Sequence, residues 1–186
     1  MPEGVFTVGV GRPVMLLMGR LVCPYLDGSG KEMSGKKSHS WVPGDVVGVP
    51  LDDRGFAYGR IREHGVAFYD FFTQRLENDL GLIISHDIAF SVVVHRSALR
   101  RWEKLGSVSL ENHLEGYIRN FRQDIQYPEQ CVVMNEEGQE FSASPEECIG
   151  LERSSVWERT HVEDRLKDCR DGRENVWVSM LSVKLV

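Results

Sequence analysis

Residues 41–61 read WVPGDVVGVPLDDRGFAYGRI, and two short runs of β-forming residues flank a polar turn within this stretch. The first run, 46–51, is rich in valine, and the second, 56–61, alternates larger residues with smaller or polar ones, as half-buried strands do. The turn at 52–55 ends in a glycine that can adopt a positive φ. The stretch therefore predicts a β-hairpin, and Pro50 indicates that its first strand ends at a sheet edge.

Apolar patterns predict further strands and three helices in the rest of the chain. Runs of β-branched and aromatic residues predict strands at 66–73, 88–95, 131–134, 139–143, 148–152 and 176–186. Apolar spacings of three and four predict helices at 96–105 and 110–121, and a third begins with a capping box at Thr160 and ends before Gly172. This order of elements indicates an α+β fold: a mainly antiparallel, strongly twisted sheet with two or three helices packed on it.

Composition divides the chain into an N-terminal extension, residues 1–40, and an α+β domain, residues 41–186. Residues 27–40, DGSGKEMSGKKSHS, are polar and rich in Gly, Ser and Lys, which predicts a flexible linker. The apolar run at 14–18 is too short for a secretory signal, so the extension is expected to stay in the mature chain. No window approaches the roughly eighteen apolar residues of a membrane span, so no membrane partner is expected.

Charge is unevenly distributed along the 186 residues, which have a formal net charge of −6. Residues 1–40 carry five Lys and Arg against three Asp and Glu, which leaves 17 basic and 25 acidic residues in 41–186, a balance of −8. An acidic domain argues against nucleic-acid binding, which needs a positive face, and suits a basic partner. The alternative is that the acidic balance serves only solubility.

The four cysteines show no metal-binding or redox pattern. Cys23, Cys131, Cys148 and Cys169 form no C-x-x-C pair, and no His pair completes a zinc motif. Three of them occupy apolar periodic positions and are interpreted as small buried residues. Pairing between cysteines is left open, although a reducing cytoplasm is the simpler context. We therefore expect no metal site and a cytoplasmic protein.

No catalytic constellation can be recognised from residue spacing. His64, His86 and His95 lie at expected strand ends or turns, and none has a nucleophile or carboxylate at a diagnostic distance along the chain. His161 lies in the first turn of the expected third helix and is interpreted as a surface residue. The G-x-G at 9–11 lacks the remaining residues of a nucleotide-binding fingerprint. The chain is accordingly expected to be no enzyme and to bind no cofactor.

Aromatic residues are concentrated around the first expected strands. They are Trp41, Phe56, Tyr58, Phe68, Tyr69, Phe71 and Phe72. Alternation along a strand sends neighbours to opposite faces of the sheet, so aromatic side chains are expected on both faces. Either both faces are covered and form core, or one face is exposed as a contact surface.

Three stretches occur together and in order: WVPGDVVGVPLDDRGFAYGRI, VAFYDFF and ECIGLERSSVWERTHVEDRLKD. Through them residues 41–186 resemble the Immunity protein 26 family of bacterial polymorphic toxin systems. The resemblance implies a mostly β fold, a gene beside a toxin gene, and protection of the producing cell by binding the cognate toxin. It implies no catalytic residues.

The function predicted from these features is an immunity protein that neutralises a cognate toxin by non-covalent occlusion, and a nuclease is one candidate for that toxin. Two alternatives come from other classes. The GDVVGVPL opening at 44–51 also begins small β-barrel ribonucleases of toxin–antitoxin pairs, in which Arg60, Arg62 and His64 would face RNA. The other alternative is an interaction domain unrelated to toxins.

Acidic pairs at expected turns are the predicted partner-binding residues. They are Asp52, Asp53, Glu136, Glu137, Glu146 and Glu147. Turn positions are exposed, and negative charge would steer the protein toward a basic cleft. The alternative for all six is that they are solvated turn residues without a partner.

Overall fold

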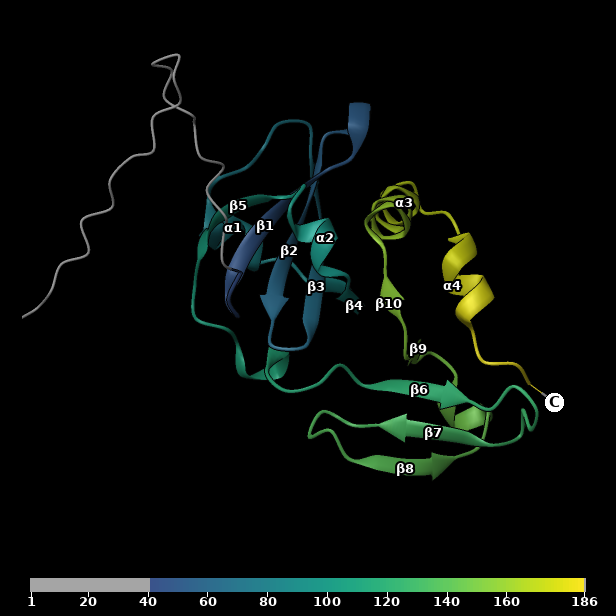
Figure 1. The fold of residues 1–186 in the computed structure, drawn as a ribbon. Helices are drawn as coiled ribbons and strands as arrows, with labels where there is room; N and C mark the ends of the chain where they lie inside the picture. Colours follow the sequence, from purple (N-terminus) through teal and green to yellow (C-terminus); the bar gives the residue numbers. More distant parts are fainter. Residues whose placement is uncertain (1–40, 186) are drawn as a thin grey trace, which may run out of the picture. The chain divides into compact units, whose positions relative to one another are not determined.

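A computed structural model describes residues 41–185 of the chain. The predicted extension 1–40, its linker 27–40 and Cys23 lie outside the described residues. The described residues confirm the α+β class, with mostly antiparallel strands and four α-helices (Figure 1). The strands form two sheets where the sequence predicted one.

The first sheet contains six strands within the described part of the chain, in the order β10-β4-β3-β2-β1-β5. Their bounds are β1 (Asp45–Pro50), β2 (Phe56–Arg62), β3 (Gly65–Thr73), β4 (Ile88–Val94), β5 (Glu103–Ser107) and β10 (Val156–Trp157). Neighbours are antiparallel except β10, which runs parallel to β4. The four strands predicted between 46 and 95 are thereby confirmed.

The second sheet is smaller and has the order β8-β7-β6-β9. Its strands are β6 (Asn120–Gln123), β7 (Cys131–Met134), β8 (Glu140–Ala143) and β9 (Glu152–Arg153). The hairpin of β7 and β8 confirms the one predicted at 131–143. Neither sheet closes into a barrel within residues 41–185, so the β-barrel alternative loses its structural basis.

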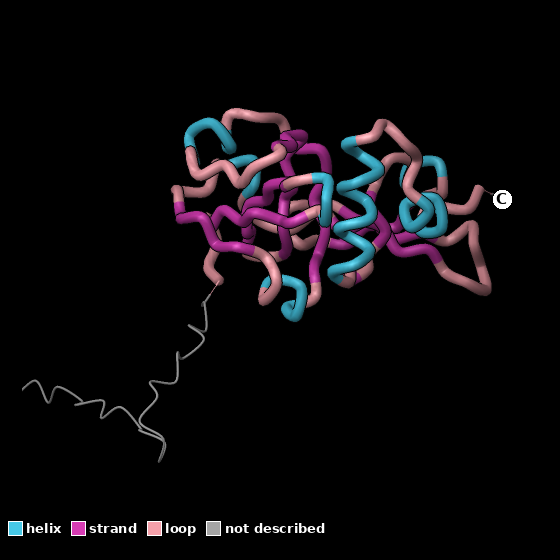
Figure 2. The backbone as a smooth tube through the Cα atoms, turned by 90° about the horizontal axis from the view of Figure 1, so that it is seen from above, coloured by secondary structure: helices cyan, strands magenta, loops and turns pink. Residues whose placement is uncertain are grey.

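Four helices complete the described fold: α1 (Leu80–Ile84), α2 (Arg96–Leu99), α3 (Arg159–Arg170) and α4 (Val176–Leu181). Three short 3₁₀ turns lie at η1 (Asp52–Arg54), η2 (Asn112–Leu114) and η3 (Glu146–Cys148). Seen from above, α3 runs between the strands of the first sheet and α4 (Figure 2). The indole of Trp102, just before β5, donates a hydrogen bond to the buried Glu163 carboxylate and so links α3 to the first sheet.

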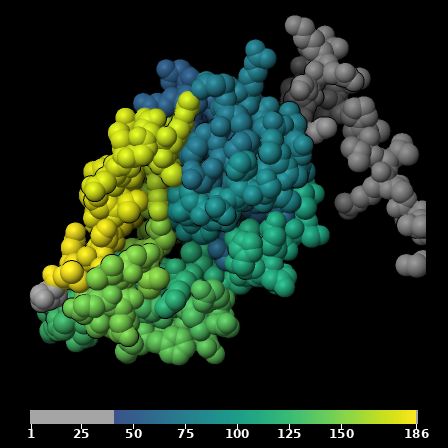
Figure 3. Space-filling model, turned by 180° about the vertical axis from the view of Figure 1, so that it is seen from behind, coloured from purple at the N-terminus to yellow at the C-terminus, as the bar shows by residue number. Residues whose placement is uncertain are grey.

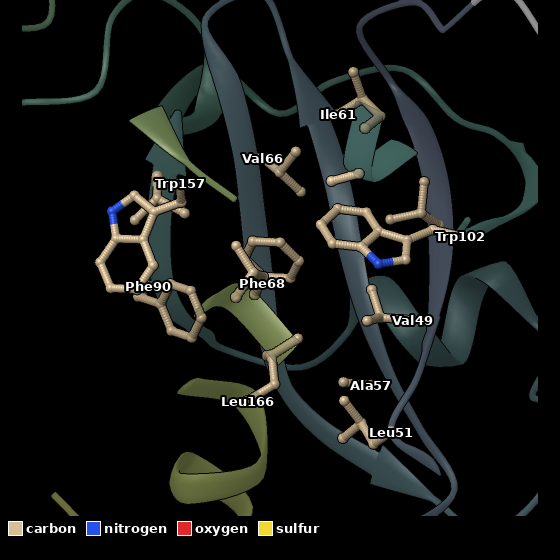
Figure 4. Close-up of a cluster of buried hydrophobic side chains, with 14 residues drawn as sticks. Val49, Leu51, Ala57, Ile61, Val66, Phe68, Phe90, Trp102, Trp157 and Leu166 are labelled. Atoms are coloured by element: carbon tan, nitrogen blue, oxygen red, sulfur yellow. The ribbon is translucent and has the colours of Figure 1, made fainter. Parts of the chain in front are cut away.

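The main hydrophobic core lies on the face of the first sheet that packs against α2, α3 and α4. Phe68, at the centre of β3, is fully buried, and its ring lies 5.1 Å from that of Phe90 and 5.6 Å from that of Trp102. Figure 4 shows Phe68 between these two aromatic groups, with Leu166 of α3 beside them. Aromatic pairs at such separations stabilise a core beyond the area they bury.

The opposite face of the first sheet is also covered. Tyr58 and Tyr69 are buried there with Val46 and Ile83, and α1 packs over them. Of the two arrangements considered for the aromatic strands, the structure therefore has core on both faces. The strands present no exposed aromatic face as a contact surface.

Helix α4 bridges the two sheets. Trp177 packs against the core of the first sheet, whereas Val183, just beyond the helix, packs against the core of the second. Arg153 of β9 donates a hydrogen bond from Nε to the carbonyl of Leu181. From behind, Figure 3 shows the C-terminal segment (yellow) lying against both the blue-to-teal and the green parts of the chain.

Three predicted elements were wrong, and in the first two distant residues supply the backbone partners. The helix predicted at 96–105 stops at Leu99, since β5 pairs with β1 instead. The helix predicted at 110–121 is a loop followed by β6, which pairs with β7 and β9. The strand predicted at 176–186 is α4, because the side chain of Asn175 accepts hydrogen bonds from the first N–H groups of a helix.

Smaller differences concern element ends and one missed helix. Helix α3 is confirmed, but it begins at Arg159 after Glu158, so Thr160 is not its cap. The strand predicted at 148–152 is reduced to β9. Helix α1 was not predicted; the Asp79 side chain caps it by accepting from the Leu82 N–H.

Gly55 tests the turn that the opening stretch predicted. Its φ is 86°, and a Cβ there would collide with the carbonyl oxygen of Thr73 on β3. We expect Gly55→Ala to lower the free energy of unfolding by about 2 kcal/mol, because a strained backbone and a clash coincide. Gly150 is the matched control: its φ is 82° but open space surrounds it, so Gly150→Ala should cost only about 1 kcal/mol. Urea denaturation of both variants measures the difference, and equal losses would contradict the clash.

Candidate partner-binding site

All six acidic residues predicted as contacts are exposed, as turn chemistry implied: Asp52, Asp53, Glu136, Glu137, Glu146 and Glu147. Three of them have structural partners. Lys167 of α3 donates to Asp52 at 2.6 Å and lowers the pKa of that carboxyl, and the Glu147 carboxylate accepts from the Ser144 N–H. Hydrogen bonds from its own backbone and from the Ser144 side chain lower the pKa of Glu146. These three side chains are therefore partly committed to the fold.

The structure does not gather the three acidic pairs into one patch. Asp52 and Asp53 lie in the turn between β1 and β2, at the top of Figure 1. Glu136 and Glu137 lie in the β7–β8 turn at the bottom, and η3, with the remaining pair, follows β8 at the other end of that hairpin. A single partner would have to cover a large area to contact all three.

A groove with a volume of about 870 Å³ lies between α2, the β2–β3 turn and the segment before β6. Its lining is mostly apolar and aromatic, with charged groups at the edge. The lining residues are Trp41, Pro43, Ile61, Arg62, Glu63, His64, Gly65, Val66, Val93, Val94, Arg96, Leu99, Arg100, Tyr117 and Met134. Such a mixture is typical of interaction sites.

Two aromatic rings make one wall of this groove rigid. The His64 imidazole stacks on the Tyr117 ring with 3.8 Å between centroids and 6° between planes. His64 is set by the β2–β3 turn, and Tyr117 precedes β6. The stack therefore joins two segments far apart in sequence and fixes both side chains.

Buried arginines of β2 hold the loop that carries Tyr117 against the sheet. Arg62 donates from Nε to the carbonyl of Leu114 at 2.8 Å and from Nη2 to those of Glu115 and Tyr117. Burial lowers the pKa of Arg62, and the charge of Glu136 opposes that shift. Arg60 is fully buried. Neither arginine faces solvent as the ribonuclease alternative requires.

The histidines considered for catalysis have stacking or capping partners. His86 stacks on Phe71 and His161 packs on Trp177, while the His95 ring accepts from the Ser97 N–H at the start of α2. Within residues 41–185, no group of three His, Cys, Asp or Glu side chains is arranged to hold a metal ion. None of the helices described is both long and apolar enough to cross a membrane.

The three described cysteines are free thiols. Cys131 and Cys148 are buried in the core of the second sheet, which confirms their interpretation as small buried residues. Burial raises the pKa of Cys148 to about 11, and contact with Cys131 adds to this shift. Cys169 is only partly buried.

Sequence reasoning missed two basic residues of the groove, Arg96 and Arg100. Both fall within the helix predicted at 96–105, and neither was singled out. Their spacing of four, which places them on one side of a helical turn, was the available signal. That this helical turn lines the same groove as Tyr117 and Trp41 could not be predicted from the sequence, since it depends on the tertiary fold.

Comparison with known proteins gives one match. No curated protein and no solved structure matches this chain. The family model of Immunity protein 26 matches residues 42–131, which include β1 to β6 and every groove residue except Trp41 and Met134. The stretch 147–168, which contributed to the resemblance, lies beyond the match. The match supports an immunity function in general, and with it the binding of a toxin partner. The family predicted from the sequence, Immunity protein 26, is thus confirmed over residues 42–131.

Proposed function

We propose that this chain binds a cognate bacterial toxin, encoded by an adjacent gene, and blocks it non-covalently without catalysing a reaction. The family match is the observation that carries the proposal. The proposed site of action is the cytoplasm of the producing cell, and the free thiols suit that compartment. Neither nucleic acid nor a membrane is proposed as a partner.

The fold suits inhibition by occlusion. Both faces of the first sheet are covered, so the scaffold is rigid, and its turns and groove remain available for contact. Rigid surfaces bind with little loss of conformational entropy. An inhibitor of this kind needs complementary shape and charge more than reactive groups.

Co-expression tests the proposal. The toxin from the neighbouring gene is induced in a sensitive host with and without this chain, and survival is counted while complex formation is followed by co-purification. Survival only in the presence of the chain, together with a complex, is the expected result. Rescue without a complex would contradict occlusion, and no rescue would contradict the immunity function. Growth arrest caused by the chain alone would favour a toxin.

The acidic turns remain a proposal for long-range attraction of a basic toxin. Asp53, Glu137 and Glu146 are exposed, and one residue from each pair is chosen for the test. We expect Asp53→Lys, Glu137→Lys or Glu146→Lys to slow association by about three- to tenfold at low salt, with less effect at high salt. Glu174→Lys, at another exposed site, is the control and should change the rate less than twofold.

Stopped-flow or biosensor association rates at two salt concentrations measure this effect. If all three turn variants associate like the control, the acidic turns are solvated residues and the contact surface lies elsewhere. An effect confined to one turn would assign the contact to that turn.

A further inference from the structure

We propose that the groove between α2, the β2–β3 turn and Tyr117 receives a segment of the toxin that combines carboxylates with an apolar side chain. This inference rests on the proposed function and adds the contact surface and the chemistry of the segment. It assigns to the groove a sign of charge opposite to that of the domain as a whole.

Unpaired cations at the groove edge give the first reason. The side chains of Arg96 and Arg100 are exposed, and neither side chain makes a hydrogen bond or ion pair with the described residues. Within the lining, Glu63 is the only acidic residue. Guanidinium groups bind carboxylates through paired hydrogen bonds, so two free guanidinium groups on one side of a short helix favour a segment with carboxylates.

The apolar lining gives the second reason. Val93 and Tyr117 are 38% and 37% exposed, and Leu99 and Met134 extend the same surface. The stack of His64 on Tyr117 holds this wall in place before any partner binds. Arginine and aromatic residues around an apolar pocket are the usual composition of an interface centre. The occupant should therefore insert an apolar side chain between its carboxylates.

Other occupants fit the groove less well. Residues 1–40 of this chain carry five Lys and Arg against three Asp and Glu, so their net charge does not complement Arg96 and Arg100. The phosphates of a nucleic acid would be repelled by the net charge of −8 on residues 41–186, and they would make no use of the apolar lining. A second copy would have to present one of its own acidic turns.

The test measures binding of the full chain to the toxin domain of the neighbouring gene, inactivated by substitution, by titration calorimetry. The double variant Arg96→Glu/Arg100→Glu reverses the groove edge. Arg101→Glu/Arg119→Glu is the matched control, with the same charge change at two exposed arginines outside the groove lining. We expect the Kd to rise at least thirtyfold in the first variant and less than threefold in the control.

A second measurement identifies the segment. Fifteen-residue peptides that tile the toxin domain are titrated into the wild-type chain, and binding peptides are remade with Asn and Gln for Asp and Glu. We expect binding peptides to contain carboxylates beside an apolar residue and to lose at least tenfold in affinity on remaking. Unfolding curves of both arginine variants should match wild type, because these exposed side chains make no hydrogen bond or ion pair with the described residues.

The outcomes separate the inference from the function it rests on. Absence of any complex with the wild-type chain overturns both. A complex with equal Kd for wild type and Arg96→Glu/Arg100→Glu overturns the groove alone. If the two double variants lost the same affinity, the effect would come from net charge alone, and the groove proposal would also be overturned. Binding of a single-stranded oligonucleotide, or self-association in sedimentation, that is lost only in the groove variant would assign the groove to that occupant instead.

Discussion

Phe68→Ala is expected to lower the free energy of unfolding by about 4 kcal/mol, because it removes a large ring from a tightly packed site. Phe68 is fully buried and contacts the rings of Phe90 and Trp102. Gly59 on the neighbouring strand leaves room for this ring, since a Cβ there would approach it to 3.0 Å. Neighbours held by two sheet strands cannot collapse fully into the cavity. A loss of this size is a large part of the roughly 5–15 kcal/mol that stabilises a domain.

Phe141→Ala is the control for this prediction. Phe141 lies on β8 and is 52% exposed, so its truncation should cost less than about 1 kcal/mol. Guanidinium denaturation followed by tryptophan fluorescence measures both variants. Similar midpoints for the two would show that the core on this face of the first sheet is not the main source of stability.

Arg60→Met is expected to lower the free energy of unfolding by about 3 kcal/mol, because it removes two hydrogen bonds that a buried, charged guanidinium donates. The Arg60 guanidinium is fully buried and donates to the carbonyls of Val108 and Ser109 at 3.0 and 2.5 Å. Its Nη2 also lies 3.6 Å from the carboxylate of Glu111. Methionine preserves much of the volume, so the loss isolates the polar contacts.

Arg122→Met provides the comparison, since Arg122 is exposed and its ion pair with Glu140 is solvated. Such pairs contribute about 0–1 kcal/mol. Besides denaturation, hydrogen exchange of residues 108–111 should speed up in Arg60→Met, because this residue holds that part of the loop to the sheet. Unchanged exchange in that loop would contradict its role as a clamp, whatever the total stability.

The placement of the acidic turns and of the groove shows the limits of reading this site from sequence. Turn residues such as Asp53 and Glu137 were expected at the surface and lie there, since turn chemistry depends only on neighbouring residues. That they lie in separate places could not be foreseen, because their separation depends on how the two sheets are arranged. The groove was missed altogether, since α2, the β2–β3 turn and Tyr117 are brought together by contacts between residues about fifty positions apart.

Residues 45–73 and 159–170 were determined largely by their own sequence. Three local signals decided them: the alternation of side chains along the strands, the turn ending in Gly55 and the apolar stripe of α3. Side-chain periodicity predicts a strand or a helix wherever one face of the element is buried. Asn175, the cap of α4, is also a local signal, and the strand predicted at 176–186 overlooked it. The tertiary structure alone decided residues 103–123, whose apolar spacing fits both helix and strand. There the backbone followed the partners that the fold brought close, β1 for β5 and Arg60 and Arg62 for the loop, because buried N–H and C=O groups must be paired.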